Sequence, residues 1–157
     1  MPEPATPRDV VMALMQGISD GAWEGLHDWY AEDAVVEYPF ALPVPTRLEG
    51  RQAIKDYFAL AARSPLRLLL RDMVVHETAD PEVVAAEWTY DGQGADGRAF
   101  QVANIQVTRV RDGKILASRD YHNHFVLTEA MGRLPRLLAA LEGGQGRPPR
   151  TESPPDP

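Results

Sequence analysis

The chain contains no cysteine, which excludes disulfide bonds, a thiolate nucleophile and cysteine-ligated zinc or iron–sulfur sites. It is also poor in positive charge, with 16 Lys and Arg against 23 Asp and Glu and a net charge of -7. Nucleic-acid binding depends on clustered cationic side chains. We therefore expect no nucleic-acid partner.

Long apolar runs are missing as well. No window is long and apolar enough to span a bilayer, and the N-terminal residues lack the basic and apolar regions of a secretory signal peptide. We expect no membrane partner and a cytoplasmic location. The chain also lacks a phosphate-binding glycine loop and a dinucleotide fingerprint, so no nucleotide or other cofactor is expected.

The length of 157 residues and the apolar content of 44% fit one globular domain. Apolar spacing predicts helices over 7–18, from Asp20 through Tyr30, and from Gly50 onward. Period-two alternation predicts strands over 34–40, 66–77, 83–90, 98–110 and 114–126. Short turns between the last four strands indicate an antiparallel meander, and a helical segment over 128–141 follows.

The domain boundary is predicted at residue 142. From 143 to 157 glycine and proline are the only apolar residues, so this segment cannot contribute to a core. We expect a single α+β domain over 1–142 and a disordered tail over 143–157.

The segment 118–125 carries an acid and two of the four histidines at alternate positions of a predicted strand. Asp120, His122 and His124 would then project from one face, because successive strand side chains alternate. Leu116 and Val126 share this parity, which indicates a polar patch within an apolar surface, as in a ligand pocket. The alternatives are a solvated strand face and a dimer contact.

An aspartate beside an imidazole can form an acid/base pair, since burial raises the pKa of Asp and a neighbouring imidazolium lowers it. Tyr38, on the apolar side of the first strand, can donate to an enolate oxygen or can be a core aromatic. A metal held by the two histidines with Asp120 or His76 is a further alternative, but the spacing fixes no third ligand. We predict no metal.

The remaining predicted site residues are pocket walls. Strand parity places Trp88 toward the pocket and Glu87 away from it. Asn104 can offer an amide to a ligand or make a cross-strand hydrogen bond. The apolar walls are expected to come from Trp23, Phe40, Phe58 and Trp88.

Four segments, 29–40, 48–54, 110–115 and 119–121, resemble the nuclear transport factor 2-like superfamily, particularly its SnoaL-like and ketosteroid-isomerase-like branch. Residues 75–83 resemble proteins of the phenazine-biosynthesis A/B type. The resemblance covers residues 8–132. It implies a cone-shaped α+β fold in which a curved, mostly antiparallel sheet wraps around N-terminal helices and encloses an apolar cavity.

In cyclase-like members of this superfamily a late-strand carboxylate serves as acid/base, and Asp120 matches that position. Members often carry a second acid shortly afterwards, where this chain has Asn123. The resemblance implies a cofactor-independent isomerase, cyclase or dehydratase acting on a small hydrophobic carbonyl compound. The alternative is a non-catalytic module that binds a small hydrophobic ligand or mediates assembly, which an Asp120 tied to an arginine would favour.

The resemblance also implies a homodimer formed through the outer face of the sheet. The sequence agrees with this implication, because helices can cover only one face of a broad sheet. Apolar side chains on the other face, such as Ile105 and Val107, would then need a partner surface.

Overall fold

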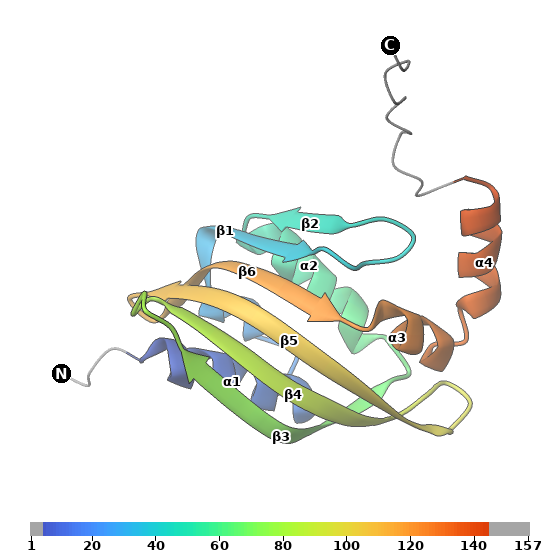
Figure 1. The fold of residues 1–157 in the computed structure, drawn as a ribbon, viewed down its shortest axis with the longest axis horizontal. Coiled ribbons are helices and arrows are strands. Elements are labelled where there is room, and N and C mark those ends of the chain that lie inside the picture. The colour runs from blue at the N-terminus through green and yellow to red at the C-terminus, as the bar shows by residue number, and fades with distance from the viewer. Residues whose placement is uncertain (1–4, 145–157) are drawn as a thin grey trace, which may run out of the picture.

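A computed structural model describes residues 5–144 and shows one curved sheet of six strands in the order β2-β1-β6-β5-β4-β3. Figure 1 shows the sheet with helices against its concave side. The strands are β1 (Tyr30–Tyr38), β2 (Thr46–Glu49), β3 (Arg67–Glu77), β4 (Val83–Gln93), β5 (Ala99–Arg111) and β6 (Lys114–His122). The helices are α1 (Pro7–Ser19), the 3-10 helix η1 (Leu26–Trp29), α2 (Arg51–Ala62), α3 (His124–Ala130) and α4 (Leu134–Glu142).

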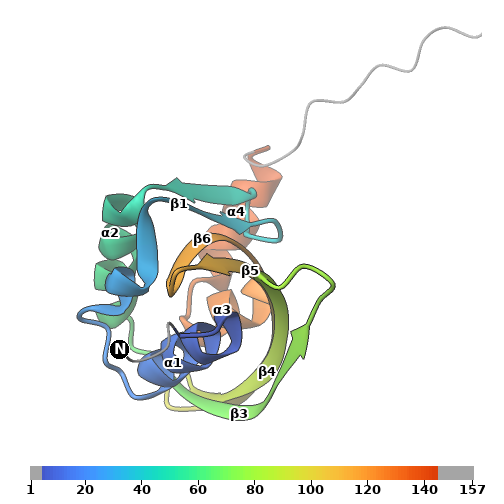
Figure 2. The same cartoon turned by 90° about the vertical axis from the view of Figure 1, so that its left-hand side faces the viewer.

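Helix α1 lies inside the curve of the sheet, as the end-on view in Figure 2 shows. Its start is fixed by a capping box, in which Thr6 and Asp9 satisfy each other's backbone N–H groups. The residues at helical spacing that face the sheet are fully or almost fully buried: Val10, Val11, Leu14 and Met15. This apolar face forms the floor of the core.

The meander β3-β4-β5-β6 is antiparallel, and only the pairing of β1 with β6 is parallel. Register shifts interrupt β3 between Arg71 and Val74 and β5 between Arg109 and Val110. Such irregularities increase local twist and help a sheet to curl around a helix. The predicted fold class is confirmed: α+β, with a curved, mostly antiparallel sheet wrapped around N-terminal helices.

Two predicted elements near the N-terminus were wrong. The expected helix from Asp20 through Tyr30 is reduced to η1, because Gly25 takes a left-handed conformation (φ 86°) and Tyr30 already begins β1. The first strand is therefore β1, which starts earlier than expected and ends at Tyr38. The short strand β2, which pairs with β1, was not predicted.

The last predicted strand, 114–126, was too long. β6 ends at His122, because the Asn123 side chain accepts a hydrogen bond from the backbone N–H of Val126 and caps α3. The pairing of β5 with β6 also shifts at Leu116. Ile115 is therefore buried, and Leu116 does not lie on the same face of β6 as Asp120.

The C-terminal helical segment is two helices, α3 and α4, with Pro135 in the first turn of α4. The predicted tail over 143–157 lies outside the described residues apart from Gly143 and Gly144. Of the helices in the described part of the chain, none is long and apolar enough to cross a membrane.

Candidate functional site

A cavity of about 490 Å³ lies between the concave face of the sheet and helices α1, α2 and α3. Apolar and aromatic side chains make up most of its wall, and they include Leu14, Met15, Trp23, Phe58, Trp88 and Leu127. The volume is typical of small-molecule sites, which are concave and mostly apolar with a few placed polar groups.

One group of polar residues in the cavity wall comes from β5 and β6. Gln106 pairs in register with Asp120, Asn104 with His122 and Thr108 with Ser118, so polar residues face one another across the two strands. Gln106, Asp120 and His122 line the cavity, whereas Ser118 and Thr108 lie deeper in the core. Alternation along both strands thus concentrates the polar side chains at one end of an apolar chamber.

Most of these buried polar atoms are unpaired. Buried polar groups in proteins nearly always have hydrogen-bond partners, so this cluster can offer hydrogen bonds to a bound molecule or to water. Within residues 5–144, the buried side-chain atoms that lack a partner are Trp88 Nε1, Gln106 Nε2 and Oε1, Thr108 Oγ1, Ser118 Oγ, Asp120 Oδ1, His122 Nε2 and His124 Nε2.

Asp120 is the one acidic residue in the cavity wall, and its side chain has no ion pair with any residue in the described range 5–144. Burial raises the pKa of its carboxyl from 3.8 to about 7. The adjacent Ser118 hydroxyl and Gln106 amide hold the pKa below the value that burial alone would give. A carboxyl with this pKa can both accept and release a proton near neutral pH.

His122 is half-buried, and desolvation together with the nearby His124 lowers the pKa of its imidazole to about 4. His122 is therefore neutral at pH 7 and cannot balance a negative charge on Asp120. Its unpaired Nε2 atom can instead donate or accept one hydrogen bond, according to the tautomer.

His124 reaches this region from α3 and not from the strand, because β6 has already ended. Its ring stacks on His122 with 5.9 Å between centroids and meets Tyr38 edge-on at 6.0 Å. Burial lowers the pKa of His124 as well. His124 is not part of the cavity wall, and its contacts support the rings of His122 and Tyr38.

Four tyrosines share the cavity wall with Asp120. Burial is the main cause that raises the pKa of each phenol, and a charge on Asp120 raises each of them further: Tyr30, Tyr38, Tyr57 and Tyr90. Their hydroxyls remain protonated at neutral pH and can serve as hydrogen-bond donors. Tyr38 stacks on Tyr57 with 5.2 Å between ring centroids, and the Tyr90 hydroxyl lies 3.5 Å from the Met15 sulfur.

The structure places most of the predicted site residues at the cavity. Asp120, His122, Tyr38, Trp23, Phe58 and Trp88 line it, while Glu87 points to the outer face and pairs with His76 at 3.1 Å. Phe40 was predicted as a wall but does not line the cavity. β1 ends at Tyr38, and Phe40 lies beyond it in a turn, 63% exposed, where it packs edge-on against Tyr121.

Asn104 was a further predicted binding residue, and it is buried but not part of the cavity wall. Its side-chain amide donates to the backbone carbonyl of Val102 at 3.1 Å. This local hydrogen bond turns the amide away from the chamber. Asn104 therefore does not line the cavity, and its contact with a ligand stays a prediction.

Sequence reasoning missed Gln106, Tyr30, Tyr57 and Tyr90 as residues of the site. Gln106 had a visible signal, because it alternates with Asn104 and Thr108 along one strand and all three face the same side. Tyr90 also had one, because it shares the strand parity of Trp88, whereas Tyr30 and Tyr57 had none. The approach of the three tyrosines to Asp120 depends on how β1, α2 and β4 converge in space.

A metal centre has no support in the described range 5–144, where no three His, Cys, Asp or Glu side chains converge. His76, considered as a third ligand, lies on the outer face of the sheet with Glu87 and is separated from His122 by the sheet itself.

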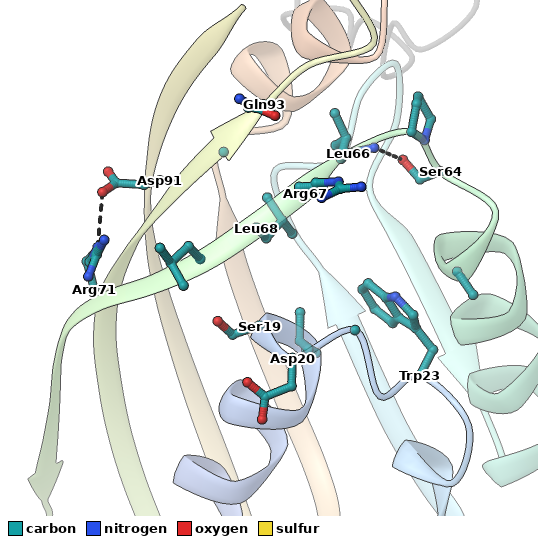
Figure 3. A pocket seen from close by; sticks show the side chains of 16 residues that line it. Ser19, Asp20, Trp23, Ser64, Leu66, Arg67, Leu68, Arg71, Asp91 and Gln93 are labelled. Carbon is teal, nitrogen blue, oxygen red and sulfur yellow. Dashed lines mark hydrogen bonds and ion pairs between the residues drawn. The ribbon is translucent and has the colours of Figure 1, made fainter. Parts of the chain in front are cut away.

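A second, more open hollow of about 800 Å³ lies between the end of α1 and β3 (Figure 3). An ion pair between Arg71 and Asp91, 3.1 Å long, borders this outer groove. The outer groove and the cavity share five lining residues and are therefore adjacent: Ile18, Trp23, Ser64, Leu66 and Leu68.

Comparisons with known proteins agree with this architecture. The family of SnoaL-like domains matches residues 11–118. An uncharacterized PhzA/B-like protein from Pseudomonas aeruginosa is 30% identical over 138 residues, which are 87% of this chain and 97% of that protein.

Two solved structures are similar. A Bacillus subtilis protein for which isomerase activity is suggested is 30% identical, with a TM-score of 0.74 over 80% of this chain and 92% of that chain. A suggested polyketide cyclase from Pseudomonas putida has a TM-score of 0.68 over 80% of this chain and 98% of that chain. The second is 22% identical, and its likeness shows the fold alone.

Proposed function

The chain belongs to the SnoaL-like domain family, within the nuclear transport factor 2-like superfamily, and we propose that it is a cofactor-independent isomerase, cyclase or dehydratase. Its substrate would be a small, largely apolar carbonyl compound. The isomerase activity suggested for the Bacillus subtilis relative, at 30% identity, supports this class of chemistry.

One observation carries the proposal: Asp120 is a carboxyl group without an ion pair in the described structure, buried in the wall of an apolar cavity, with a pKa of about 7. Structural carboxylates are usually exposed or paired with cations, which lowers their pKa. A general base is most effective when its pKa is near the working pH. The absence of a paired arginine favours the enzyme over the non-catalytic binding module.

Asp120 would remove a proton from the carbon next to the substrate carbonyl and return it at another position. The developing enolate oxygen would accept hydrogen bonds from neutral donors in the wall, namely the Tyr38 hydroxyl, the His122 imidazole and the Gln106 amide. Trp23, Phe58 and Trp88 would hold the apolar body of the substrate and keep water away. His124 would act as a positioning residue, through its stacking on His122.

Exchange of hydrogen for deuterium at the α-carbon tests this proposal without knowledge of the natural substrate. Hydrophobic ketones such as 1-tetralone and 2-acetylnaphthalene would be incubated with the protein in D2O and followed by NMR. We expect exchange above the buffer rate, and we expect Asp120→Asn to lower it by about a hundredfold or more, because the amide keeps the shape but not the basicity.

Calorimetric binding of the same ketones separates the two functions. Glu87→Gln on the outer face is the matched control and should exchange at the parent rate. If the ketones bind and Asp120→Asn exchanges as fast as the parent, Asp120 is not the base. If they bind and no exchange exceeds background, the protein is the binding module.

We also propose a homodimer that forms through the convex face of the sheet. Leu69, Val74 and Ile105 on this face are each between 46 and 48% exposed. Exposed apolar side chains on a sheet face can contribute to an interaction surface.

A further inference from the structure

The charged side chains of the cavity wall are unevenly distributed. Asp120 is buried at the polar end, and the other two charged residues in the wall are arginines, Arg63 and Arg133. Both arginines are exposed, so they lie where the cavity meets solvent. Leu60, which is 67% exposed, also belongs to this mouth.

The two arginines come from different parts of the chain. Arg63 caps the C-terminal end of α2, and Arg133 lies in the connection between α3 and α4. Within residues 5–144 neither guanidinium makes an ion pair, in contrast to four arginines of the sheet: Arg47, Arg71, Arg109 and Arg111. In a chain with a net charge of -7, the cavity mouth thus carries two arginines and, among the described residues, no carboxylate.

The nearby acids do not neutralise this mouth. Asp20 and Asp91 line the adjacent outer groove, but in the described structure neither forms an ion pair with Arg63 or Arg133, and Asp91 is held by Arg71 and Gln101. Neither lines the cavity itself.

We propose that the substrate is an amphipathic acid: a hydrophobic carbonyl compound whose far end carries a carboxylate, which Arg63 and Arg133 bind at the cavity mouth. This inference rests on the proposed function, since it assumes that the reacting carbonyl lies at Asp120. An arginine guanidinium is well suited to a carboxylate, because its planar N–H groups match the two oxygens.

The same charges fix the orientation of the substrate. A carboxylate at the inner end would lie beside Asp120, where an anion would be repelled and would also lose its hydration. At the mouth it keeps partial contact with water and gains two cations. The aromatic middle of the cavity then holds the apolar body between the two ends.

Calorimetric titration with a matched pair of two-ring ketones tests the inference. The probes are 6-acetyl-2-naphthoic acid and its neutral isostere 6-acetyl-2-naphthamide. Exposed ion pairs contribute modestly, so we expect the acid to bind about tenfold more tightly than the amide at low salt. High salt should reduce this ratio, because the arginines are exposed to screening.

The double variant Arg63→Gln with Arg133→Gln should bring the ratio of the two dissociation constants close to one, with the amide affinity unchanged. Arg136→Gln is the control, since Arg136 is an exposed arginine on α4 that does not line the cavity. It should leave the ratio as in the parent.

The outcomes separate this inference from the proposed function. If the amide binds and the acid binds no more tightly, the arginine site is wrong while the pocket stands. If the double variant keeps the parent ratio, the arginines are not the carboxylate site. If neither probe binds, the inference is overturned together with the function on which it rests.

Discussion

The concave and convex faces of strands β4, β5 and β6 differ in how their polar side chains are paired. On the concave face, Gln106, Ser118 and Asp120 are buried and have side-chain atoms without partners in the described structure. On the convex face and its rim, several charges are paired, as in Arg71–Asp91 at 3.1 Å and Arg109–Glu82 at 2.9 Å. Neighbouring residues of the same strands thus face opposite environments.

Two carboxyl groups show the consequence. Hydrogen bonds from Arg111 and Arg109 lower the pKa of Glu82 from 4.5 to about 2, whereas burial raises the pKa of Asp120 from 3.8 to about 7. In the folded protein, the hydrogen bonds to Glu82 stabilise its carboxylate form, whereas burial destabilises the carboxylate form of Asp120. An unpaired buried acid lowers stability at neutral pH, and such a cost is common at active sites.

The largest expected effect is the dependence of stability on Asp120 and pH. Because its pKa is raised on folding, the folded protein binds the proton more tightly than the unfolded chain between pH 4 and 7. Stability should therefore fall as pH rises through this window. The full shift corresponds to a contribution on the order of 4 kcal/mol.

Urea unfolding of the parent and Asp120→Asn at pH 5, 6, 7 and 8 measures this contribution. The amide side chain of the variant cannot ionise. The unfolding free energy of the variant minus that of the parent should therefore increase at each step up to pH 7. Parallel pH profiles for the two proteins would show that Asp120 titrates normally and would remove the contrast with Glu82.

A smaller effect is expected from the apolar centre of the convex face. Ile105→Lys would place a charge in the proposed dimer interface. The Ile105 side chain would become buried on dimerisation. Its loss should therefore increase the dissociation constant of the dimer by about tenfold or more. Sedimentation velocity over a concentration series measures the change.

Leu138→Lys is the control for this experiment, because Leu138 on α4 is also 48% exposed and lies on a helix beyond the sheet. It should leave the dissociation constant as in the parent. A parent protein that is monomeric at micromolar concentration would contradict the proposed homodimer.

The same contrast explains how much of the fold was predictable from sequence. Alternation located β3, β4 and β5 to within a few residues, since one face of each strand is apolar or buried. The predicted ends of helices and strands were wrong where a single residue interrupted the apolar spacing. Gly25 stopped a helix with its left-handed conformation, and Asn123 ended β6 by capping α3.

Sequence spacing predicted the part of the site that lies along β6 and four cavity-wall residues on other segments, namely Trp23, Tyr38, Phe58 and Trp88. Asp120 and His122 were found together because two-residue spacing places them on one face. Gln106 and the tyrosines reach Asp120 from other elements, so their contribution depends on register and packing that spacing does not encode. The prediction that Phe40 lines the cavity assumed that strand alternation continues to residue 40, but β1 ends at Tyr38.

The smallest effect is expected from Glu82, on the paired side of the comparison. Its two carboxylate oxygens accept hydrogen bonds from Arg109 and Arg111, over 2.6 to 2.9 Å. Glu82→Gln would remove a charge from an exposed network, and exposed ion pairs contribute little to stability. We expect a small loss of Tm at pH 7 and no change in ketone exchange.

The pH dependence of this loss has the opposite sign to that of Asp120. Since the pKa of Glu82 is lowered on folding, its stabilisation is complete above its ordinary pKa of 4.5 and disappears as pH falls through about 2. The Tm difference between the parent and Glu82→Gln should therefore shrink as pH falls from 5 to 2, and it should also shrink in 1 M NaCl. Glu24→Gln, at an exposed acid without an ion pair in the described structure, is the control and should show no such trend. A Tm difference that stayed constant over this pH range would mean that Glu82 acts through packing and not through its charge.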